Sequence, residues 1–294
     1  MEASLPSGVS WNELAPDYPS LEIEIPSCSA KLALHGAHLI HWQPSHATSP
    51  VLYTSPTAVY RGGKAIRGGL PICWPWFNAH PTDPATHPSH GVARKLFWKL
   101  ETVEMKGDDL HLTFTLPTSE TVEAHVPFAH EVHLRMILGQ TCHIALETKN
   151  LSEQNISVGG ALHSYLAVSD IANISLKGLQ NTPYLDTTTS PAGRCTQTEA
   201  DFRVTGEVDS IYTGFAHEVL LHDEELNSII TVAKTNSLTT VVWNPCSEKA
   251  TALDDLPNEA YRDFICVEAA NAHHDARIVP PNASHILTTT LSVS

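Results

Sequence analysis

Two ionisable side chains lie in apolar stretches, where such groups are uncommon. Glu268 ends the run Phe264-Ile-Cys-Val267, and His163 follows the apolar, glycine-led stretch Gly159-Gly-Ala-Leu162. A buried carboxylate is rare unless it is paired or functional, so we interpret Glu268 as functional. A lone histidine on an apolar strand is more often a core residue than a catalyst. Carboxylates and imidazoles both serve in general acid–base catalysis.

A second group of candidates lies in the glycine-rich stretch between residues 61 and 77. Arg61 and Arg67 each precede a Gly-Gly pair, and Lys64 lies between them. Glycine lets backbone approach a ligand closely, and the planar guanidinium suits phosphate, carboxylate or sugar hydroxyls. A tight turn that enters a core strand explains the same residues. The stretch lacks the Gly-x-x-x-x-Gly-Lys-Ser/Thr pattern of a nucleotide-binding P-loop.

The stretch Ser89-His-Gly-Val-Ala-Arg-Lys95 places His90 and Arg94 on either side of a small-residue turn. Such a turn is typical of a recognition loop, with Arg94 as a second contact for an anion. A surface turn with a salt-bridged arginine is the alternative.

The histidines do not form a metal-binding pattern. His35, His38 and His41 are spaced by three, and residues i and i+3 of a strand point to opposite faces. His273 and His274 are adjacent and diverge likewise. The chain also lacks a His-Glu-x-x-His motif and a Gly-x-Ser-x-Gly nucleophile turn. We therefore expect neither a metal site nor acyl-transfer chemistry.

Short strands must position these side chains, because alternating apolar and polar residues dominate the chain. The pattern predicts strands over residues 21–25, 111–116, 131–138, 143–148, 228–233, 239–243, 264–267 and 286–291. Short helices are expected near Leu253 and over 259–262. Many short strands separated by turns predict an all-β fold, a sandwich or barrel. No linker divides the chain, so we expect one domain over 1–294.

Charge is unevenly distributed along the sequence. The chain of 294 residues has 17 basic and 32 acidic side chains, and its formal net charge is −15. This acidity argues against binding to nucleic acid or to an anionic membrane, since both need a positive field. From Ile25 to Leu100, however, Asp83 is the one acidic residue among seven basic ones. The segment either recognises a small anion or merely contains carboxylate-poor strands.

The cysteines and the N-terminal region indicate a compartment. The six cysteines are widely spaced, without a Cys-x-x-Cys pair, and isolated thiols usually behave as small buried hydrophobes. Neither a signal peptide nor a run of about 18 apolar residues is present. We expect a reduced, cytoplasmic protein that acts as a monomer.

Six stretches, which cover most of the chain, share one resemblance. The sequence resembles the aldose 1-epimerase (mutarotase) superfamily, and within it the hexose-6-phosphate mutarotase branch. The matching stretches follow the family's order: Ile66-Arg-Gly-Gly-Leu-Pro-Ile-Cys-Trp-Pro-Trp-Phe77, His90-Gly-Val-Ala-Arg94, Ala161-Leu-His-Ser-Tyr165 with Ser169-Asp-Ile-Ala-Asn173, Val208-Asp-Ser-Ile-Tyr212, Val242-Trp-Asn-Pro245 and Cys266-Val-Glu-Ala269.

The resemblance implies a fold, an activity and a set of site residues. The fold is a large antiparallel β-sandwich of the galactose-mutarotase type. The activity is the cofactor-free interconversion of the α and β anomers of a hexose 6-phosphate, a small-molecule substrate. The implied catalytic pair is His163 and Glu268, and the implied substrate-binding residues are Arg67, Ser89, His90, Arg94 and Asp209.

The implied reaction needs one base and one acid. We expect an ionised Glu268 to take the proton of the C1 hydroxyl and a protonated His163 to give one to the ring oxygen. Asp209 would hold a hydroxyl or orient the histidine. Two departures bear on sugar preference: Ser89 stands where some relatives have Gln, and Val92 where Phe is common.

Three other functions remain open on the sequence. An epimerase of neutral sugars such as galactose would have fewer basic residues near the first motif. A non-catalytic carbohydrate-binding β-sandwich would not need Glu268 together with His163. A metal-dependent cupin-like enzyme would contain metal when purified.

Overall fold

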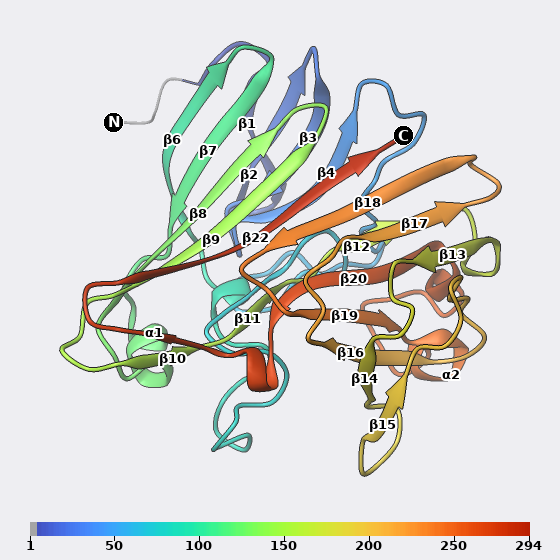
Figure 1. Cartoon of the computed structure of the whole chain (residues 1–294). Helices are drawn as coiled ribbons and strands as arrows, with labels where there is room; N and C mark the ends of the chain where they lie inside the picture. The colour runs from blue at the N-terminus through green and yellow to red at the C-terminus, as the bar shows by residue number, and fades with distance from the viewer. Residues whose placement is uncertain (1–4) are drawn as a thin grey trace.

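The computed structural model describes residues 5–294, and antiparallel β-sheets make up most of it (Figure 1). The first large sheet has eight strands in the spatial order β13 (Ile174–Lys177), β17 (Val219–Asp223), β18 (Ser228–Thr235), β22 (Ser284–Val293), β9 (Cys142–Asn150), β8 (His130–Leu138), β7 (Asp109–Thr115) and β6 (Lys99–Lys106).

The second large sheet also has eight strands; Glu268 lies on one of them, and His163 lies in the gap between two others. Its spatial order is β15 (Gly193–Thr196), β14 (Pro183–Asp186), β16 (Val208–Thr213), β19 (Thr239–Asn244), β20 (Phe264–Asn271), β11 (Gly160–Leu162) and β5 (Ile72–Cys73), and β12 (Tyr165–Ala167) pairs with β20 beside β11.

Two smaller sheets and several short helices complete the described residues. The smaller sheets consist of β1 (Val9–Ala15), β2 (Tyr18–Ile25), β3 (Cys28–Ala33) and β4 (His38–Pro44), and of β10 (Ile156–Val158) and β21 (Arg277–Val279). The helices are α1 (Glu120–His125) and α2 (Cys246–Ala250), with 3₁₀ turns η1 (Ala93–Lys95), η2 (Ile171–Asn173), η3 (Ala260–Asp263) and η4 (His273–Asp275). Within residues 5–294, these helices fall short of the length and apolarity that crossing a membrane requires.

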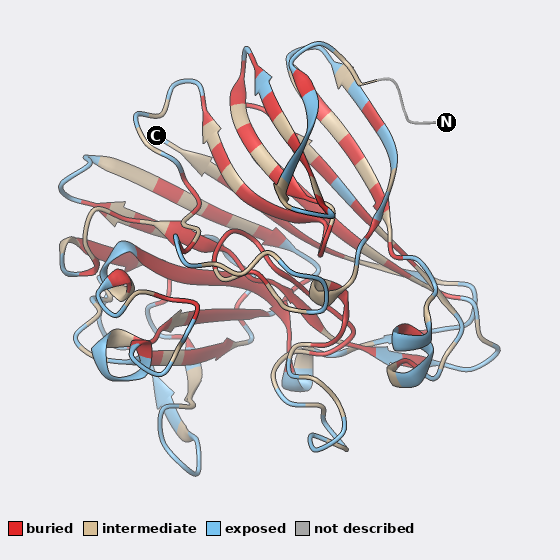
Figure 2. Ribbon diagram, turned by 180° about the vertical axis from the view of Figure 1, so that it is seen from behind, coloured by how far each residue is buried: buried red, intermediate tan, exposed pale blue. Residues whose placement is uncertain are grey.

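Burial differs between the two large sheets (Figure 2). In β7 every second residue is buried, as expected of a strand with one face on the core and one near solvent. In β20 all eight residues are buried, because both faces of this strand are covered. A charged side chain on β20 is therefore removed from water.

One hydrophobic core joins the sheets. Its largest cluster contains Leu21 of the four-stranded sheet, Phe114 of the first large sheet and Val267 of the second. Strands β18 and β22 of the first sheet contact β20 of the second. The second sheet thus packs one face on this core and leaves its other face to form the site.

The all-β prediction is confirmed, and each of the eight expected strand ranges overlaps a strand. The helix expected near Leu253 is α2, which ends earlier, at Ala250, and Leu253 itself lies outside regular secondary structure. Pro257 follows closely and has no backbone N–H to continue a helix. The helix expected over 259–262 is the short η3, and α1 was not predicted.

Candidate active site

His163 and Glu268 face each other because of strand register. β11 and β12 pair antiparallel with β20 in one continuous register, although the ladder is interrupted between them. That register puts His163 directly opposite Glu268, and directly opposite residues project from the same face of a sheet. The interruption occurs where the backbone N–H of His163 donates to the carbonyl of Pro71 (3.1 Å).

The two side chains are in contact and almost fully buried. Nε2 of His163 lies 3.3 Å from Oε1 of Glu268, and the residues are 6% and 1% exposed. Nδ1 of the imidazole and Oε2 of the carboxyl have no hydrogen-bond partner within residues 5–294. Each group therefore keeps one buried polar atom without a partner in the described part of the chain.

Burial favours the neutral form of both groups. It raises the pKa of Glu268 well above the ordinary range of a carboxyl. It lowers the pKa of His163 well below the ordinary range, and His90, Arg94 and Arg67 lower it further. The ionised Glu268 and protonated His163 expected from the sequence are thus not the forms that this environment favours. The sequence shows residue types, but not the combined burial and nearby cations that set the protonation states.

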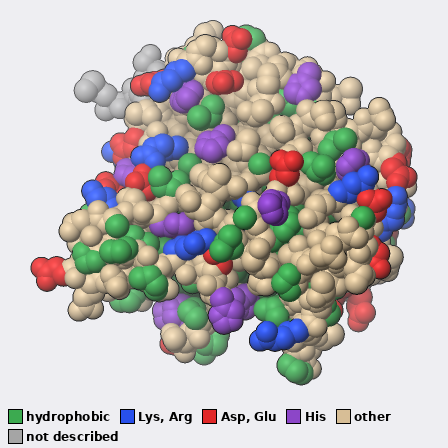
Figure 3. All heavy atoms as spheres, viewed as in Figure 1, with side chains coloured by type: hydrophobic (Ala, Val, Ile, Leu, Met, Phe, Trp, Pro, Cys, Tyr) green, Lys and Arg blue, Asp and Glu red, His purple; other side chains and the backbone are tan. Residues whose placement is uncertain are grey.

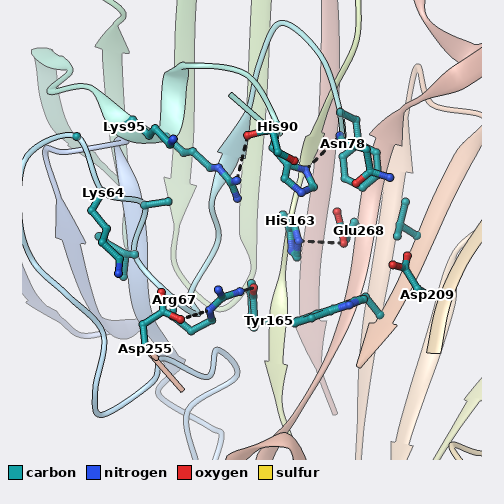
Figure 4. A pocket seen from close by; sticks show the side chains of 18 of the residues that line it. Lys64, Arg67, Asn78, His90, Lys95, His163, Tyr165, Asp209, Asp255 and Glu268 are labelled. Carbon is teal, nitrogen blue, oxygen red and sulfur yellow. Dashed lines mark hydrogen bonds and ion pairs between the residues drawn. The ribbon is translucent and has the colours of Figure 1, made fainter. Parts of the chain in front are cut away.

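Arg67 is held by two side chains from different segments (Figure 4). Its Nε donates to Oδ1 of Asp255 (3.0 Å), and its Nη1 donates to the hydroxyl of Tyr165 (3.2 Å). Burial opposes the charge, but Tyr165 and Asp255 raise the pKa of Arg67 above its usual value. The guanidinium therefore stays charged and in a fixed position.

The segment that contains Ser89, His90 and Arg94 lines the same cavity as His163 and Glu268. Nη2 of Arg94 donates to the carbonyl of Ser89 (3.2 Å), and no carboxylate within residues 5–294 pairs with this arginine. The surface turn with a salt-bridged arginine is therefore not what forms. His90 accepts from the backbone N–H of Asn78 through Nδ1 (3.3 Å), and burial, Arg94 and Arg67 lower the pKa of His90 to about 3. The neutral imidazole of His90 therefore lines the cavity.

Asp209 lies on β16, on the same face of the sheet but away from the histidine. Its Oδ2 is 4.0 Å from Nζ of Lys249, and burial raises its pKa. No hydrogen bond joins Asp209 to His163 within the described residues, and the partner of His163 is Glu268. Of the two roles expected for Asp209, only contact with a ligand hydroxyl fits this position.

One cavity of about 730 Å³ brings all these residues together. Figure 4 shows Lys64, Arg67 and Lys95 on one side of His163, and Asp209 on the other. The cavity is thus cationic at one end, with the acid–base pair in its middle. Every site residue that the sequence predicted lines it: Arg67, Ser89, His90, Arg94, His163, Asp209 and Glu268.

Sequence reasoning missed three residues that shape the site. Tyr165 stacks on His163, with ring centroids 5.0 Å apart and planes 10° apart, and Trp243 stands edge-on to both rings. Strand periodicity could have found Tyr165, which lies two residues after His163. Asp255 had no such signal, because nothing in the sequence distinguishes it from Asp254.

The described residues 5–294 contain no group of three or more His, Cys, Asp or Glu side chains placed to hold a metal ion. What the site does contain is a buried imidazole–carboxyl pair, a group of cations and an aromatic wall. This arrangement is suited to moving protons on a polar, anionic molecule.

Comparison with known proteins agrees with this geometry. The family model described as aldose 1-epimerase matches residues 19–292. An Escherichia coli (strain K12) protein provisionally named glucose-6-phosphate 1-epimerase is 33% identical over 264 residues, which cover 90% of this chain and 87% of that protein.

Solved structures show the same fold. A provisionally named mutarotase from Salmonella typhimurium superposes with a TM-score of 0.91 at 31% identity, covering 99% of this chain and 95% of that one. A galactose mutarotase related enzyme from Lactobacillus acidophilus superposes with a TM-score of 0.73 at 13% identity, covering 94% and 97%. The second likeness concerns the fold alone.

Proposed function

The chain belongs to the aldose 1-epimerase family and is an isomerase, and we propose that it interconverts the α and β anomers of glucose 6-phosphate or a closely related hexose 6-phosphate. The observation that carries the proposal is the buried His163–Glu268 contact beside a cluster of cations in one cavity. The pair accounts for the proton transfers and the cations for the phosphate.

The reaction needs two proton movements and no other reactant. Glu268 takes the proton of the C1 hydroxyl while His163 gives a proton to the ring oxygen, so the ring opens to an aldehyde. Rotation about the C1–C2 bond exposes the other face of the carbonyl. The two transfers then run in reverse, and the pair ends with the proton count with which it began. The proposed enzyme therefore needs no cofactor.

The phosphate group would itself favour a protonated histidine. Arg67 and Arg94 help to keep His163 neutral, since both lower its pKa. A phosphate bound between them adds negative charge and reduces that effect. Arg94 lowers the pKa of Glu268 as well, so the same phosphate also favours the protonated carboxyl. The proton must therefore pass from Glu268 to His163 across their 3.3 Å contact as the reaction begins, and Glu268 then acts as the base.

The cations support a phosphorylated rather than a neutral substrate. Lys64 and Lys95 line the cavity near Arg67 and Arg94, and no carboxylate within residues 5–294 pairs with either lysine. Like charges that gather without counterions repel one another, so the arrangement costs stability unless an anion is bound. A binding module without catalysis would have no use for the buried acid–base pair.

We further propose that the protein is a cytoplasmic monomer. All six cysteines are free thiols, which suits a reducing compartment. The large apolar side chains that are exposed come from separate segments of the chain rather than from one stretch: Trp11, Phe97, Leu151, Leu226, Leu238 and Ile278. Such scattered exposure is normal for a monomer.

Anomer exchange measured by NMR tests the function directly. The purified protein is added to equilibrated glucose 6-phosphate and, separately, to glucose, and the α–β exchange rates are compared with the uncatalysed rates. We expect clear acceleration for the phosphorylated sugar and much less for glucose. Equal acceleration of both sugars would remove the phosphate from the proposal.

Two variants test the acid–base pair in the same assay. Glu268→Gln and His163→Asn each remove one proton carrier and keep a polar side chain, so each lowers the rate by roughly 10²–10⁴-fold. Ser169→Ala, which changes a hydroxyl bonded to Asp223 outside the cavity, is the control. A full rate in either pair variant would show that the assignment is wrong.

A further inference from the structure

Three of the cations depend on a segment without regular secondary structure. Residues 56–71, which we call the cation loop, contain Arg61, Lys64 and Arg67 and are neither helix nor strand. A loop of this kind fixes its side chains only if other parts of the protein hold its backbone. The loop ends enter the fold through isolated bridges of Gly68 with Thr54 and of Leu70 with Leu39.

His38 holds the second Gly-Gly pair of this loop. The imidazole is fully buried, and its Nε2 donates to the carbonyl of Gly68 (2.8 Å). Gly69 has a φ of +64°, and a Cβ there would lie 2.7 Å from Nε2 of His38. The histidine therefore packs directly against the backbone that follows Arg67, and only a glycine leaves room for it.

His35 holds the first Gly-Gly pair in the same way. It is also fully buried, and its Nε2 accepts from the backbone N–H of Gly63 (3.1 Å). The ring packs between Tyr18 and Phe97, at centroid distances of 5.2 and 5.0 Å. This contact lies one residue before Lys64.

Both histidines are neutral, and their tautomers follow from their partners. Burial lowers the pKa of His38 to about 3, and burial lowers the pKa of His35 as well. His38 must carry its proton on Nε2, because that atom donates to a carbonyl. His35 must have a bare Nε2, because that atom accepts. His38 thus holds the loop by a donated hydrogen bond and His35 by an accepted one. Neither imidazole adds a charge next to the cations of the loop.

These residues are outside the site that they support. Neither His35 nor His38 lines the cavity, whereas Gly63 and Arg67 do. Two buried imidazoles in a core are costly unless each makes a hydrogen bond, and here each one bonds to the same loop. Their placement is explained by what they do to the backbone of that loop.

We infer that His35 and His38 are positioning residues. Their hydrogen bonds fix the backbone of the cation loop, and this sets how strongly the site prefers a phosphorylated over a neutral sugar. The inference rests on the proposed function. Without the two hydrogen bonds the loop still connects the same strands, but its cations are no longer held at one end of the cavity. The acid–base pair is held by the pairing of β11 and β12 with β20 and by the bond from His163 to Pro71, at the end of the loop that the Leu70–Leu39 bridge anchors.

The preference between two sugars tests this inference. kcat and KM for anomer exchange are measured with glucose 6-phosphate and with glucose for the wild type, His35→Leu and His38→Leu. We expect each variant to lose about tenfold in kcat/KM for glucose 6-phosphate, mainly through KM, as loss of one buried hydrogen bond implies. For glucose, which makes no phosphate contact, we expect less than about a twofold change.

Conservative variants separate positioning from mere stability. The amide of glutamine reaches about as far as Nε2 of histidine and can donate or accept there, so His35→Gln and His38→Gln keep the preference of the wild type. His41→Leu is the control on the strand of His38, since the imidazole of His41 bonds to Ser29 and makes no hydrogen bond to the loop within the described residues. If His38→Leu does not fold, His38→Asn replaces it, because the shorter amide cannot reach Gly68.

Two results would overturn the inference. One is an equal loss on both sugars in the leucine variants, and the other is an unchanged preference in folded variants. A wild type that shows no preference for glucose 6-phosphate is a different failure, which contradicts the proposed function itself.

Discussion

At the scale of single residues, the proposed catalytic pair is placed at the expense of stability. Glu268 and His163 are almost fully buried, and Nε2 of the imidazole lies 3.3 Å from Oε1 of the carboxyl. A carboxyl in such a place resists ionisation.

We expect the substitution Glu268→Gln to raise the free energy of unfolding while it removes activity. Because burial raises the pKa of Glu268, the folded protein binds this proton more tightly than the unfolded chain. Wild-type stability therefore falls as pH rises from the ordinary carboxyl value toward the raised one, by up to about 1.4 kcal/mol per pH unit. Glutamine has no such slope. Urea unfolding at several pH values between about 5 and 8 measures the widening difference.

Glu147→Gln provides the comparison with the opposite sign. Although burial opposes it, the hydrogen bond from Arg135 lowers the pKa of Glu147. This carboxylate stabilises the fold above the ordinary carboxyl value and loses that contribution as pH falls through its lowered pKa. Its glutamine variant should be less stable by a constant amount over the same pH range. A constant difference for Glu268→Gln as well would contradict the burial argument.

At the scale of the elements, strands with strict alternation could be predicted and irregular ones could not. The range 131–138 lies within β8, since alternation there reflects one buried face. His163 was expected inside a strand, yet it lies in the gap between β11 and β12. Its backbone bonds to Pro71, and sequence periodicity contains no information on such a distant partner.

The site residues were predicted better than their surroundings. Arg67, Arg94, His163 and Glu268 belong to motifs that resemble a known family, so their grouping in one cavity could be expected. Asp255 belongs to a segment without regular secondary structure, and its contact with Arg67 depends on how that segment crosses the cavity. Contacts of this kind follow from tertiary packing, which local patterns do not encode.

A glycine in the turn before η1 is a strict requirement of the fold. Gly91 has a φ of +72°, and a Cβ there would lie 1.9 Å from the carbonyl oxygen of Trp74. We expect Gly91→Ala to lower the free energy of unfolding by about 3–5 kcal/mol, since the backbone must move. Activity should fall as well, because this turn places His90 and Arg94. Urea unfolding and the exchange assay measure the two effects.

Gly107→Ala separates the two reasons why Gly91→Ala is expected to lower the free energy of unfolding: the positive φ and the close approach to Trp74. Gly107 has a φ of +63°, but a methyl group at this position would have no other atom within 4 Å, so only the backbone conformation is penalised. We expect a loss of about 1 kcal/mol in this variant. Similar losses in both variants would mean that the close approach to Trp74 does not matter.

At the scale of the whole molecule, the excess of acidic side chains contrasts with a group of basic side chains in the cavity. The net charge is −15, and on the face in Figure 3 acidic and basic side chains lie scattered among uncharged ones. The cations that gather do so in the cavity, at Lys64, Arg67, Arg94 and Lys95. An acidic exterior limits contact with polyanions, while the interior of the cavity offers a small anion a local positive field.

We propose that the chain unfolds as one domain, because its largest core cluster draws residues from both large sheets and from the four-stranded sheet. Loss of any one sheet would expose the core face of the others. We expect a single urea transition, with tryptophan fluorescence and far-UV circular dichroism giving the same midpoint. Two separated transitions would show that the sheets form independent units.

The continuous register of β11 and β12 with β20 has a consequence for how this protein can change in evolution. Side chains alternate between the two faces of a strand, so one inserted or deleted residue reverses the direction of every residue beyond it. A single such event within Phe264–Asn271, ahead of Glu268, would turn the carboxylate into the core and put an apolar side chain opposite His163. Substitutions can tune this enzyme by degrees, whereas a change of length in these strands ends its chemistry at once. Lineages that keep the activity must therefore confine their insertions and deletions to the turns.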